Sequence, residues 1–327
     1  IILWIASLFE KKYVLLHIFF ILNNMRKAIV RILWALLIGS ILVTALAFTA
    51  IWFGWIGYMP PLEDLQNPIS RYATQVYTAD GKVMGTWNLN RENRICVPYS
   101  NLSPYLVKAL VATEDARFYE HSGIDFYALG RAIVKRGILG QENAGGGSTI
   151  TQQLAKQLYS DVAHSSLERL LQKPIEWVIA VKLERNYTKE ELIALYLNYF
   201  DFLHNSVGIK TASNTYFNKE PNELSVVEAA TLIGLCKNPS LFNPVRYPER
   251  CLNRRNVVLS QMQKAGYLST AEYNQLCDEK LVLDFHRVDH KDGIATYFRE
   301  FLRQYMMARR PDLNDYPAGN KRQYVID

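Results

Sequence analysis

The chain is poor in cysteine. Its 327 residues include four cysteines, which lie far apart, and no two of them form a CxxC pair. A cysteine-based zinc site needs closely spaced pairs, and a disulfide framework needs more cysteines in a shorter chain. The composition therefore predicts neither a zinc site nor a disulfide framework.

Acidic residues are outnumbered by basic ones, 31 against 37, which gives a formal net charge of +6. Such an excess suits an anionic partner, such as phosphate, a membrane surface or nucleic acid. No basic stripe with interleaved aromatic residues appears, so we do not expect nucleic acid as the partner. Hydrophobic residues make up 49% of the chain, which is enough for a packed core.

Charged residues are absent from one long stretch, residues 32–59. A helix needs about 20 apolar residues to cross a bilayer, and this stretch is longer. Three aromatic residues near its far end suit the membrane interface, whereas Arg26, Lys27 and Arg31 precede it. The positive-inside rule then places the N-terminus in the cytoplasm and the chain after Pro60 outside. We predict one retained transmembrane helix that Pro60 stops; a buried core helix and a cleaved signal peptide are the alternatives.

The rest of the chain divides by composition. Residues before Met25 start with Ile and carry charges among their apolar residues, so we assign them no function. Apolar and polar residues alternate around Asp80 and Gly81, which is typical of a hairpin. The sequence predicts five segments: an uncertain leader, 1–24; a cytoplasmic stub and transmembrane helix, 25–59; a short β-containing connector, 60–98; a mainly helical domain, 99–264; and a polar linker, 265–327.

Helix starts are visible in the helical domain. Ser103 is a candidate N-cap in front of Pro104 at the first turn. Two further starts have the Ser/Thr-x-x-Glu spacing of a capping box, Thr188 with Glu191 and Ser225 with Glu228.

The first candidate site is the stretch VATEDARFYEHSGID, residues 111–125. If the helix from Pro104 continues through it, Glu114, Phe118 and His121 share one face and Gly123 ends the helix. A partly desolvated carboxylate at the edge of a core can act as a general base or acid. The plainer alternative is a solvated helix end with a Glu114–Arg117 pair.

The second candidate site, AGGGSTITQQLAKQL, begins at residue 144. Thr149 and Gln152 have N-cap spacing, and Thr149, Gln153 and Lys156 would form a polar helix face. A helix N-terminus beside a glycine-rich loop suits an anion such as phosphate, although the GK[ST] ending of a Walker loop is absent. An ordinary flexible loop before a well-capped helix is the alternative.

The third candidate site is QKPIE, in a long helical run that contains Pro174. Glu176 lies among apolar residues, so its charge needs a partner, and Lys173 lies one turn earlier. On its own, this arrangement indicates a structural ion pair.

Taken together, the stretches resemble the peptidoglycan glycosyltransferases, glycosyltransferase family 51. EDARFYEHSG is similar to their EDxxFxxHxG motif, and GGSTITQQ to their second motif. QKPIE resembles their RKxxE motif, KEELIALYLN their KxxxLExYLN motif, and the NPSLFNP segment with Arg254 and Arg255 their fifth. The order is the family's, and the resemblance covers about residues 62–264.

The resemblance implies a mainly α, lysozyme-like glycosyltransferase domain behind one transmembrane helix. The implied substrate is lipid II, and the reaction extends a glycan strand with inversion at the sugar C1. Glu114 matches the catalytic base, and Glu176 matches the second glutamate, which assists the departing pyrophosphate, with Mg²⁺ or Mn²⁺ as a possible cofactor. The implied substrate-binding residues are Asp115, Phe118, His121, Ser148, Thr149, Gln152, Gln153, Lys156 and Lys173.

Two positions depart from the family pattern. Gln172 stands where the family usually has Arg, which removes one cation from the expected pyrophosphate contact, and Ala194 stands where it usually has Glu. No serine is followed three residues later by lysine, so we expect no transpeptidase site. The tail is similar to the linker of class A penicillin-binding proteins, so we expect the N-terminal part of such a bifunctional enzyme.

The resemblance also implies a place and partners: the plasma (inner) membrane, a catalytic domain on its outer or periplasmic side, lipid II with the growing glycan strand, and other cell-wall synthesis proteins. Two other functions stay open at this point. A lytic transglycosylase or lysozyme-like enzyme would share the fold but cleave glycan, and an inactive membrane-anchored scaffold would do neither.

Overall fold

A computed structural model describes most of the chain and is mainly α-helical. The described residues are 2–61, 64–65, 74–81, 83–87, 94–132, 134–135, 140, 146–160, 165–286 and 295–308, with side chains from residue 25 onwards. Residues 309–327 of the predicted linker and Gly145 of the glycine-rich loop lie outside them. Two compact units are present, residues 1–59 with 164–178 and residues 60–163 with 179–327.

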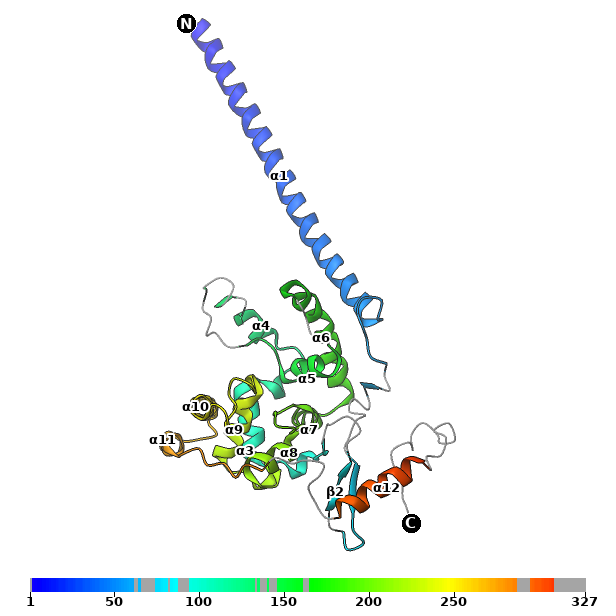
Figure 1. The fold of residues 1–327 in the computed structure, drawn as a ribbon. Helices are drawn as coiled ribbons and strands as arrows, with labels where there is room; N and C mark the ends of the chain where they lie inside the picture. The colour runs from blue at the N-terminus through cyan, green and yellow to red at the C-terminus, as the bar shows by residue number, and fades with distance from the viewer. Residues whose placement is uncertain are drawn as a thin grey trace. The chain divides into compact units, whose positions relative to one another are not determined.

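The first unit contains the apolar helix α1, Ile2–Trp52 (Figure 1). Its part Met25–Trp52 is long and apolar enough to cross a membrane, and none of its most apolar window is buried inside the protein. The helix ends at Trp52, so the prediction that Pro60 stops it is wrong. Gly54 has φ of +75°, a conformation that glycine accepts easily and that ends the helix before the prolines. Gly57 has the same φ in the segment that follows.

After Trp52 the chain returns to the first half of α6, Ser166–Asn186, which contains Pro174 as predicted. The Phe48 and Trp177 rings are stacked, with centroids 6.3 Å apart and planes within 8° of each other. A side chain at Gly57 would strike Ile175, since a Cβ there would lie 2.3 Å from Ile175 Cδ1. The end of the apolar helix therefore packs directly on the helix turn that carries Glu176.

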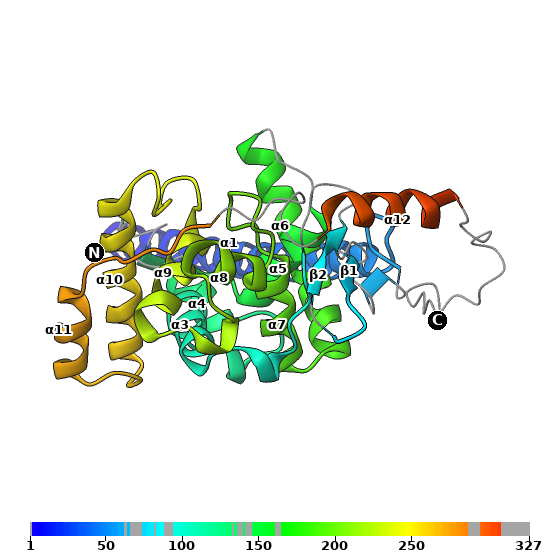
Figure 2. The same cartoon turned by 60° about the horizontal axis from the view of Figure 1, so that its bottom comes forward.

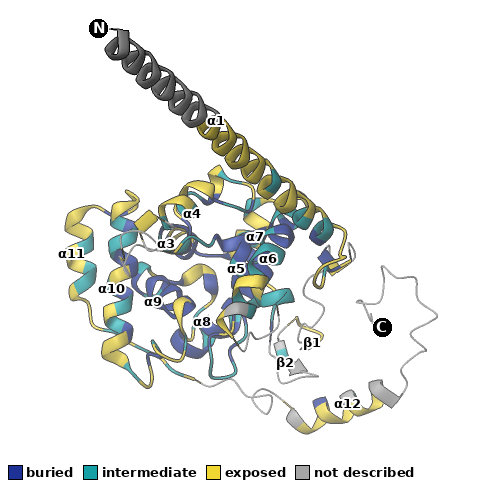
Figure 3. Ribbon diagram, turned by 90° about the horizontal axis from the view of Figure 1, so that it is seen from above, coloured by how far each residue is buried: buried dark blue, intermediate teal, exposed yellow. Residues whose placement is uncertain are grey.

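The second unit is built from short helices. α9, Val226–Lys237, is buried over most of its length (Figure 3) and packs against α3, Pro104–Glu114, and α10, Pro248–Lys264, which also contact each other. α5, Ile150–Tyr159, packs against α7, Lys189–Tyr199. The remaining elements of the helical part are η1, Tyr99–Asn101; η2, Phe118–Glu120; α4, Phe126–Ala132; α8, Ile209–Phe217; η4, Pro221–Glu223; α11, Thr270–Asp278; and α12, Thr296–Ala308.

Strands are confined, among the described residues, to one antiparallel pair, β1, Thr74–Tyr77, and β2, Val83–Trp87 (Figure 2). The turn between them contains Asp80 and Gly81, and Gly81 has φ of +79°. The predicted hairpin is therefore confirmed, as is the mainly α fold class.

Local capping signals explain where several helices begin. Both predicted capping boxes are present: the Thr188 and Ser225 hydroxyls accept from the backbone N–H groups of Glu191 and Glu228, whose carboxylates accept in return. Ser103 does stand before Pro104, but its hydroxyl donates to the Leu224 carbonyl (2.9 Å) instead of capping α3. That contact ties the start of α3 to the segment before α9.

Candidate active site

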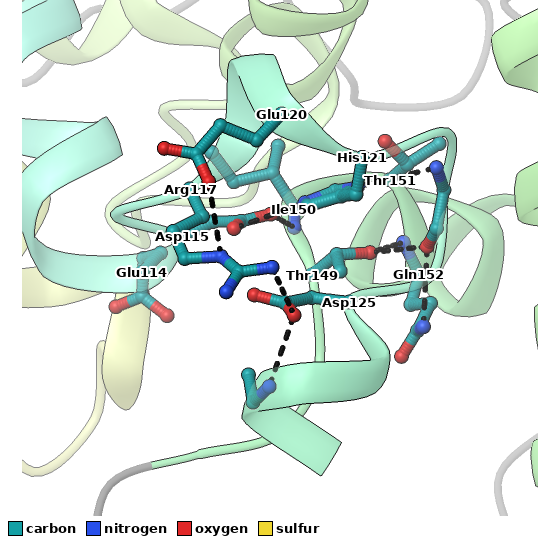
Figure 4. Close-up of polar contacts among 12 residues, drawn as sticks. Glu114, Asp115, Arg117, Glu120, His121, Asp125, Thr149, Ile150, Thr151 and Gln152 are labelled. Carbon is teal, nitrogen blue, oxygen red and sulfur yellow. Dashed lines mark hydrogen bonds and ion pairs between the residues drawn. The ribbon is translucent and has the colours of Figure 1, made fainter. Parts of the chain in front are cut away.

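The helix that carries Glu114 ends at Glu114 itself. Asp115 leaves the helical conformation, with φ of −156° and ψ of 77°, and a 3₁₀ turn at Phe118–Glu120 follows. The prediction of a helix that continues to Gly123 is therefore wrong. The physical reason is a distant partner: the Asp115 carboxylate turns inward to accept from the backbone N–H of Ile150 (3.1 Å), at the start of α5. The side chains of Glu114 and Asp115 consequently diverge (Figure 4).

Asp115 and His121 form a buried pair. The His121 Nε2 atom lies 3.0 Å from Asp115 Oδ2, and the exposed fractions of the two side chains are 5% and 4%. The other ring nitrogen, Nδ1, accepts from the backbone N–H of Gly123 (3.2 Å), so Nε2 carries the proton that is donated to Asp115. Asp115 thus joins the first motif to the start of the second.

Gly123 is the second point at which these motifs meet. Its carbonyl accepts from the Thr149 hydroxyl (2.7 Å) and from Gln152 Nε2 (3.1 Å), and both donors are buried. Gly123 has φ of +94°, and a Cβ there would lie 3.0 Å from the backbone of Ala180. Thr149 also caps α5 by accepting from the Gln152 N–H (3.1 Å), as predicted from the spacing.

Phe118, also predicted to bind substrate, is fully buried. The Lys189 ammonium group lies 4.2 Å from the centre of its ring, and Lys189 also donates to the His121 carbonyl (2.7 Å) and pairs with Glu184. Five of the predicted substrate-binding residues, Asp115, Phe118, His121, Thr149 and Gln152, therefore hold the site together from inside. Ser148 is half-buried and Lys156 is exposed on α5.

Glu114 lies at the edge of this framework, with 14% of its side chain exposed. Its Oε2 atom accepts from Gln153 Nε2 on α5 (2.9 Å). The Gln153 Oε1 atom accepts in turn from the Tyr196 hydroxyl on α7 (3.1 Å), which sets the orientation of the amide. Tyr196, Gln153 and Glu114 thus form a row of hydrogen-bonded side chains, and each of the three comes from a different helix.

A cation completes the surroundings of Glu114. Arg254 Nη2, from α10, lies 3.6 Å from Glu114 Oε1, and 10% of the Arg254 side chain is exposed. Burial lowers the pKa of the Arg254 guanidinium, whereas the nearby Glu114 charge acts to raise it. The sequence showed Arg254 as part of the fifth motif but gave no sign that it approaches Glu114, 140 positions earlier.

Two buried neutral groups border the same site. Burial raises the pKa of Tyr196 well above its ordinary value, and Cys236 and Glu114 add to the effect. Burial and Glu114 likewise raise the pKa of the Cys236 thiol. Both groups therefore stay protonated at neutral pH, so the Tyr196 hydroxyl can donate a hydrogen bond to Gln153.

Glu176, in the first unit, has its own ion pairs. Its side chain is fully buried, Lys173 Nζ lies 3.1 Å from Oε2 as predicted, and Arg169 binds both carboxylate oxygens, with Nη2–Oε2 at 3.2 Å. Arg169 also donates to Gln172 Oε1 (3.2 Å). Arg169 was not identified from the sequence as a partner of Glu176, although the two residues lie seven positions apart, which is two turns of a helix. This arginine supplies a cation beside Glu176 in the helix where Gln172 replaces the family's arginine.

The donors around Glu176 do not fit a divalent cation held by protein ligands. Glu176 is one carboxylate that already contacts two cations, and a group of three or more His, Cys, Asp or Glu residues suited to a metal is absent from the described residues. The divalent ion that the resemblance implies stays a prediction, and no step below depends on it.

These features define a helical protein with a membrane-length apolar helix and two glutamates that are paired with cations, Glu114 at the edge of the core and Glu176 fully buried. Comparison with known families then identifies it: the Transglycosylase family matches residues 80–263, more than half of the chain. The chain belongs to the transglycosylase family.

Several relatives are longer proteins. Penicillin-binding protein 1A of Haemophilus influenzae is 37% identical over 271 residues, which are 82% of this chain and 30% of the relative. The Escherichia coli protein of the same name is 36% identical over 252 residues, 77% of this chain and 29% of the relative. Penicillin-binding protein 1F of Bacillus subtilis is 42% identical over 185 residues, 57% and 25%. The chain thus spans about a third or less of the length of these relatives.

A crystal structure of Penicillin-Binding Protein 1A from Haemophilus influenzae aligns over 76% of this chain and 26% of that one, with 27% identity and a TM-score of 0.38. A score of that size adds nothing about the fold beyond the family match.

Proposed function

We propose that this chain polymerises lipid II into peptidoglycan glycan strands. In this reaction the 4-hydroxyl of one sugar attacks C1 of another with inversion, the new glycosidic C–O bond forms, and the bond from C1 to undecaprenyl pyrophosphate breaks. The hydroxyl proton must go to a base, and the diphosphate leaves with the electron pair. The transglycosylase family match supports this class of reaction.

The observation that carries the proposal is the setting of Glu114. It is a carboxylate at the edge of the core, held by Gln153 on one oxygen and faced by Arg254 at the other. A general base must be held in place and keep a lone pair free, and this setting provides both. Glu114 is therefore assigned the proton of the attacking hydroxyl.

Glu176 is assigned to the leaving group, together with Arg169 and Lys173. The trio carries one negative and two positive charges, so it has a net charge of +1. A fixed positive site stabilises negative charge that develops on a departing diphosphate. Lys156, exposed on α5, and Ser148 are further candidates for contacts with phosphate.

The anchor suits a substrate that is itself carried in the membrane. Arg26, Lys27 and Arg31 precede the apolar segment, so the positive-inside rule supports a cytoplasmic N-terminus and a catalytic domain on the outer or periplasmic face. The growing glycan strand is the second partner. The proposal also includes other cell-wall synthesis proteins as partners of this chain.

The test is polymer formation from purified lipid II by the full chain in detergent micelles. Glu114→Gln should lower the turnover on the order of 10²–10⁴-fold, because a positioned general base contributes about that much. The matched control is Glu120→Gln, which makes the same chemical change in the same motif: Glu120 is exposed and pairs with Arg117. This control should keep wild-type turnover.

Three results would overturn the proposal. Full polymerisation by Glu114→Gln would remove Glu114 from the reaction. Release of soluble fragments from polymeric peptidoglycan by the wild type, without any polymer formed from lipid II, would instead identify a glycan-cleaving enzyme. Inactivity of the wild type in both assays would indicate a scaffold.

A further inference from the structure

The two oxygens of the Glu114 carboxylate are not equivalent. Oε2 accepts a hydrogen bond of 2.9 Å from Gln153. Oε1 faces Arg254 Nη2 at 3.6 Å, a distance that suits an ion pair but is too long for a hydrogen bond. Arg254 therefore brings a charge to Oε1 without occupying its lone pairs.

Arg254 is held where it is by its surroundings. It projects from α10 past Gly234 on α9, where a Cβ would lie 3.3 Å from Arg254 Cγ. Its guanidinium carbon lies 5.9 Å from the centre of the Phe242 ring. The Arg254 Nε atom is buried and makes no hydrogen bond within the described part of the chain, so the burial of this cation is not offset at that atom.

Other groups that face Glu114 carry no charge at neutral pH. They are the Gln153 amide on α5, the Tyr196 hydroxyl on α7 and the Cys236 thiol on α9. Burial keeps Tyr196 and Cys236 protonated, as described above. Arg254 is therefore the cation that the described residues place next to this carboxylate.

We propose that Arg254 is a positioning residue for the transfer reaction: its charge holds the Glu114 carboxylate so that Oε1, the oxygen without a hydrogen bond from Gln153, is directed towards the attacking hydroxyl. The sugar proton then goes to Oε1 while Oε2 stays bound to Gln153. This inference rests on the proposed function. It assigns Arg254 a role on the base side of the reaction and none in binding the diphosphate.

The role makes a prediction about kcat. Without Arg254 the Glu114 carboxylate keeps the hydrogen bond from Gln153 but loses the cation that faces Oε1. A base that is less firmly held takes the proton less efficiently, so kcat should fall by about tenfold or more, a part of the roughly 10²–10⁴-fold that a positioned base contributes.

The experiment measures kcat and KM for lipid II with the full chain in detergent micelles. Arg254→Gln should show the lower kcat with KM changed by less than about twofold, because Arg254 is assigned no contact with the substrate. Arg254→Lys should recover most of the lost kcat, since it restores the charge. Arg250→Gln, which removes an exposed cation of the same helix, is the control.

Three outcomes would overturn the inference: a rise in KM alone in Arg254→Gln, a loss of kcat that Arg254→Lys does not recover at all, or no change. If Arg254→Gln does not fold, Arg254→Met replaces it, because methionine keeps an apolar stem and removes the charge. Wild-type kcat in Arg254→Met contradicts the role. Failure of the proposed function would look different: the wild type would form no polymer from lipid II, or Glu114→Gln would polymerise at the wild-type rate.

Discussion

Asp115→Asn should destabilise the second unit without acting on the chemistry directly. Asp115 is predicted from sequence to bind substrate, but its carboxylate is 4% exposed and accepts from both His121 Nε2 and the Ile150 N–H. Asparagine has one acceptor oxygen in place of two. Its NH₂ group would therefore meet one of these two donors, and that donor would lose its acceptor.

The magnitude follows from these contacts. A hydrogen bond to a charged group contributes about 1.5–3 kcal/mol, and a negative charge at a helix N-terminus adds about 0.3–1 kcal/mol. Asparagine keeps one bond and loses the charge, so the free energy of unfolding should fall by about 2–3 kcal/mol. For a domain of 150–250 residues this corresponds to a Tm lower by about 4–12 °C.

The assay is thermal unfolding of the full chain in detergent, followed by circular dichroism, together with KM for lipid II. Asp278→Asn, an exposed carboxylate at the end of α11, is the matched control and should stay within about 0.5 kcal/mol of the wild type. An unchanged Tm with a raised KM for Asp115→Asn would refute the reasoning. It would show that Asp115 contacts substrate, as the family resemblance implies.

Two backbone predictions test the positive-φ positions. Gly123→Ala should lower the free energy of unfolding by about 2 kcal/mol or more, because φ is +94° and the new Cβ would meet the Ala180 backbone; Gly130→Ala, in open space on α4, should not, and equal Tm values for the two would contradict the argument. Leu203→Gly should raise stability by about 0.5 kcal/mol, because Leu203 has φ of +66° and glycine relieves that strain. A lower Tm by calorimetry would mean that the Leu203 side chain contributes more than the strain costs.

Local features of the fold were predictable from the sequence. The capping boxes at Thr188 and Ser225 and the hairpin at Asp80 and Gly81 depend on residues within a few positions of one another, so their spacing was sufficient. The helix through Asp115 was predicted wrongly because the residue that ends it, Ile150, lies 35 positions away.

In the candidate site, too, contacts between residues close in sequence were predictable and contacts between distant residues were not. Lys173 was found from its spacing to Glu176, and Arg169 could have been found with the same rule extended to two turns. Arg254 could not, because the packing of α10 on α3 and α9 brings it to Glu114 and no local pattern encodes that packing. The resemblance identified the motifs. It did not distinguish buried residues that hold the motifs together, such as Asp115 and His121, from Glu114, the partly exposed carboxylate that they position.

Arg255, the neighbour of Arg254, sets a lower limit on how much chain the helical unit requires. Its side chain is fully buried, and its guanidinium donates to the carbonyls of Cys277 (3.0 Å) and Glu279 (2.8 Å), beyond the family match that ends at 263. A shortened protein that stops at the end of the match would lack both carbonyl acceptors of the Arg255 guanidinium, one residue from Arg254. Truncation studies should therefore retain α11 and Glu279.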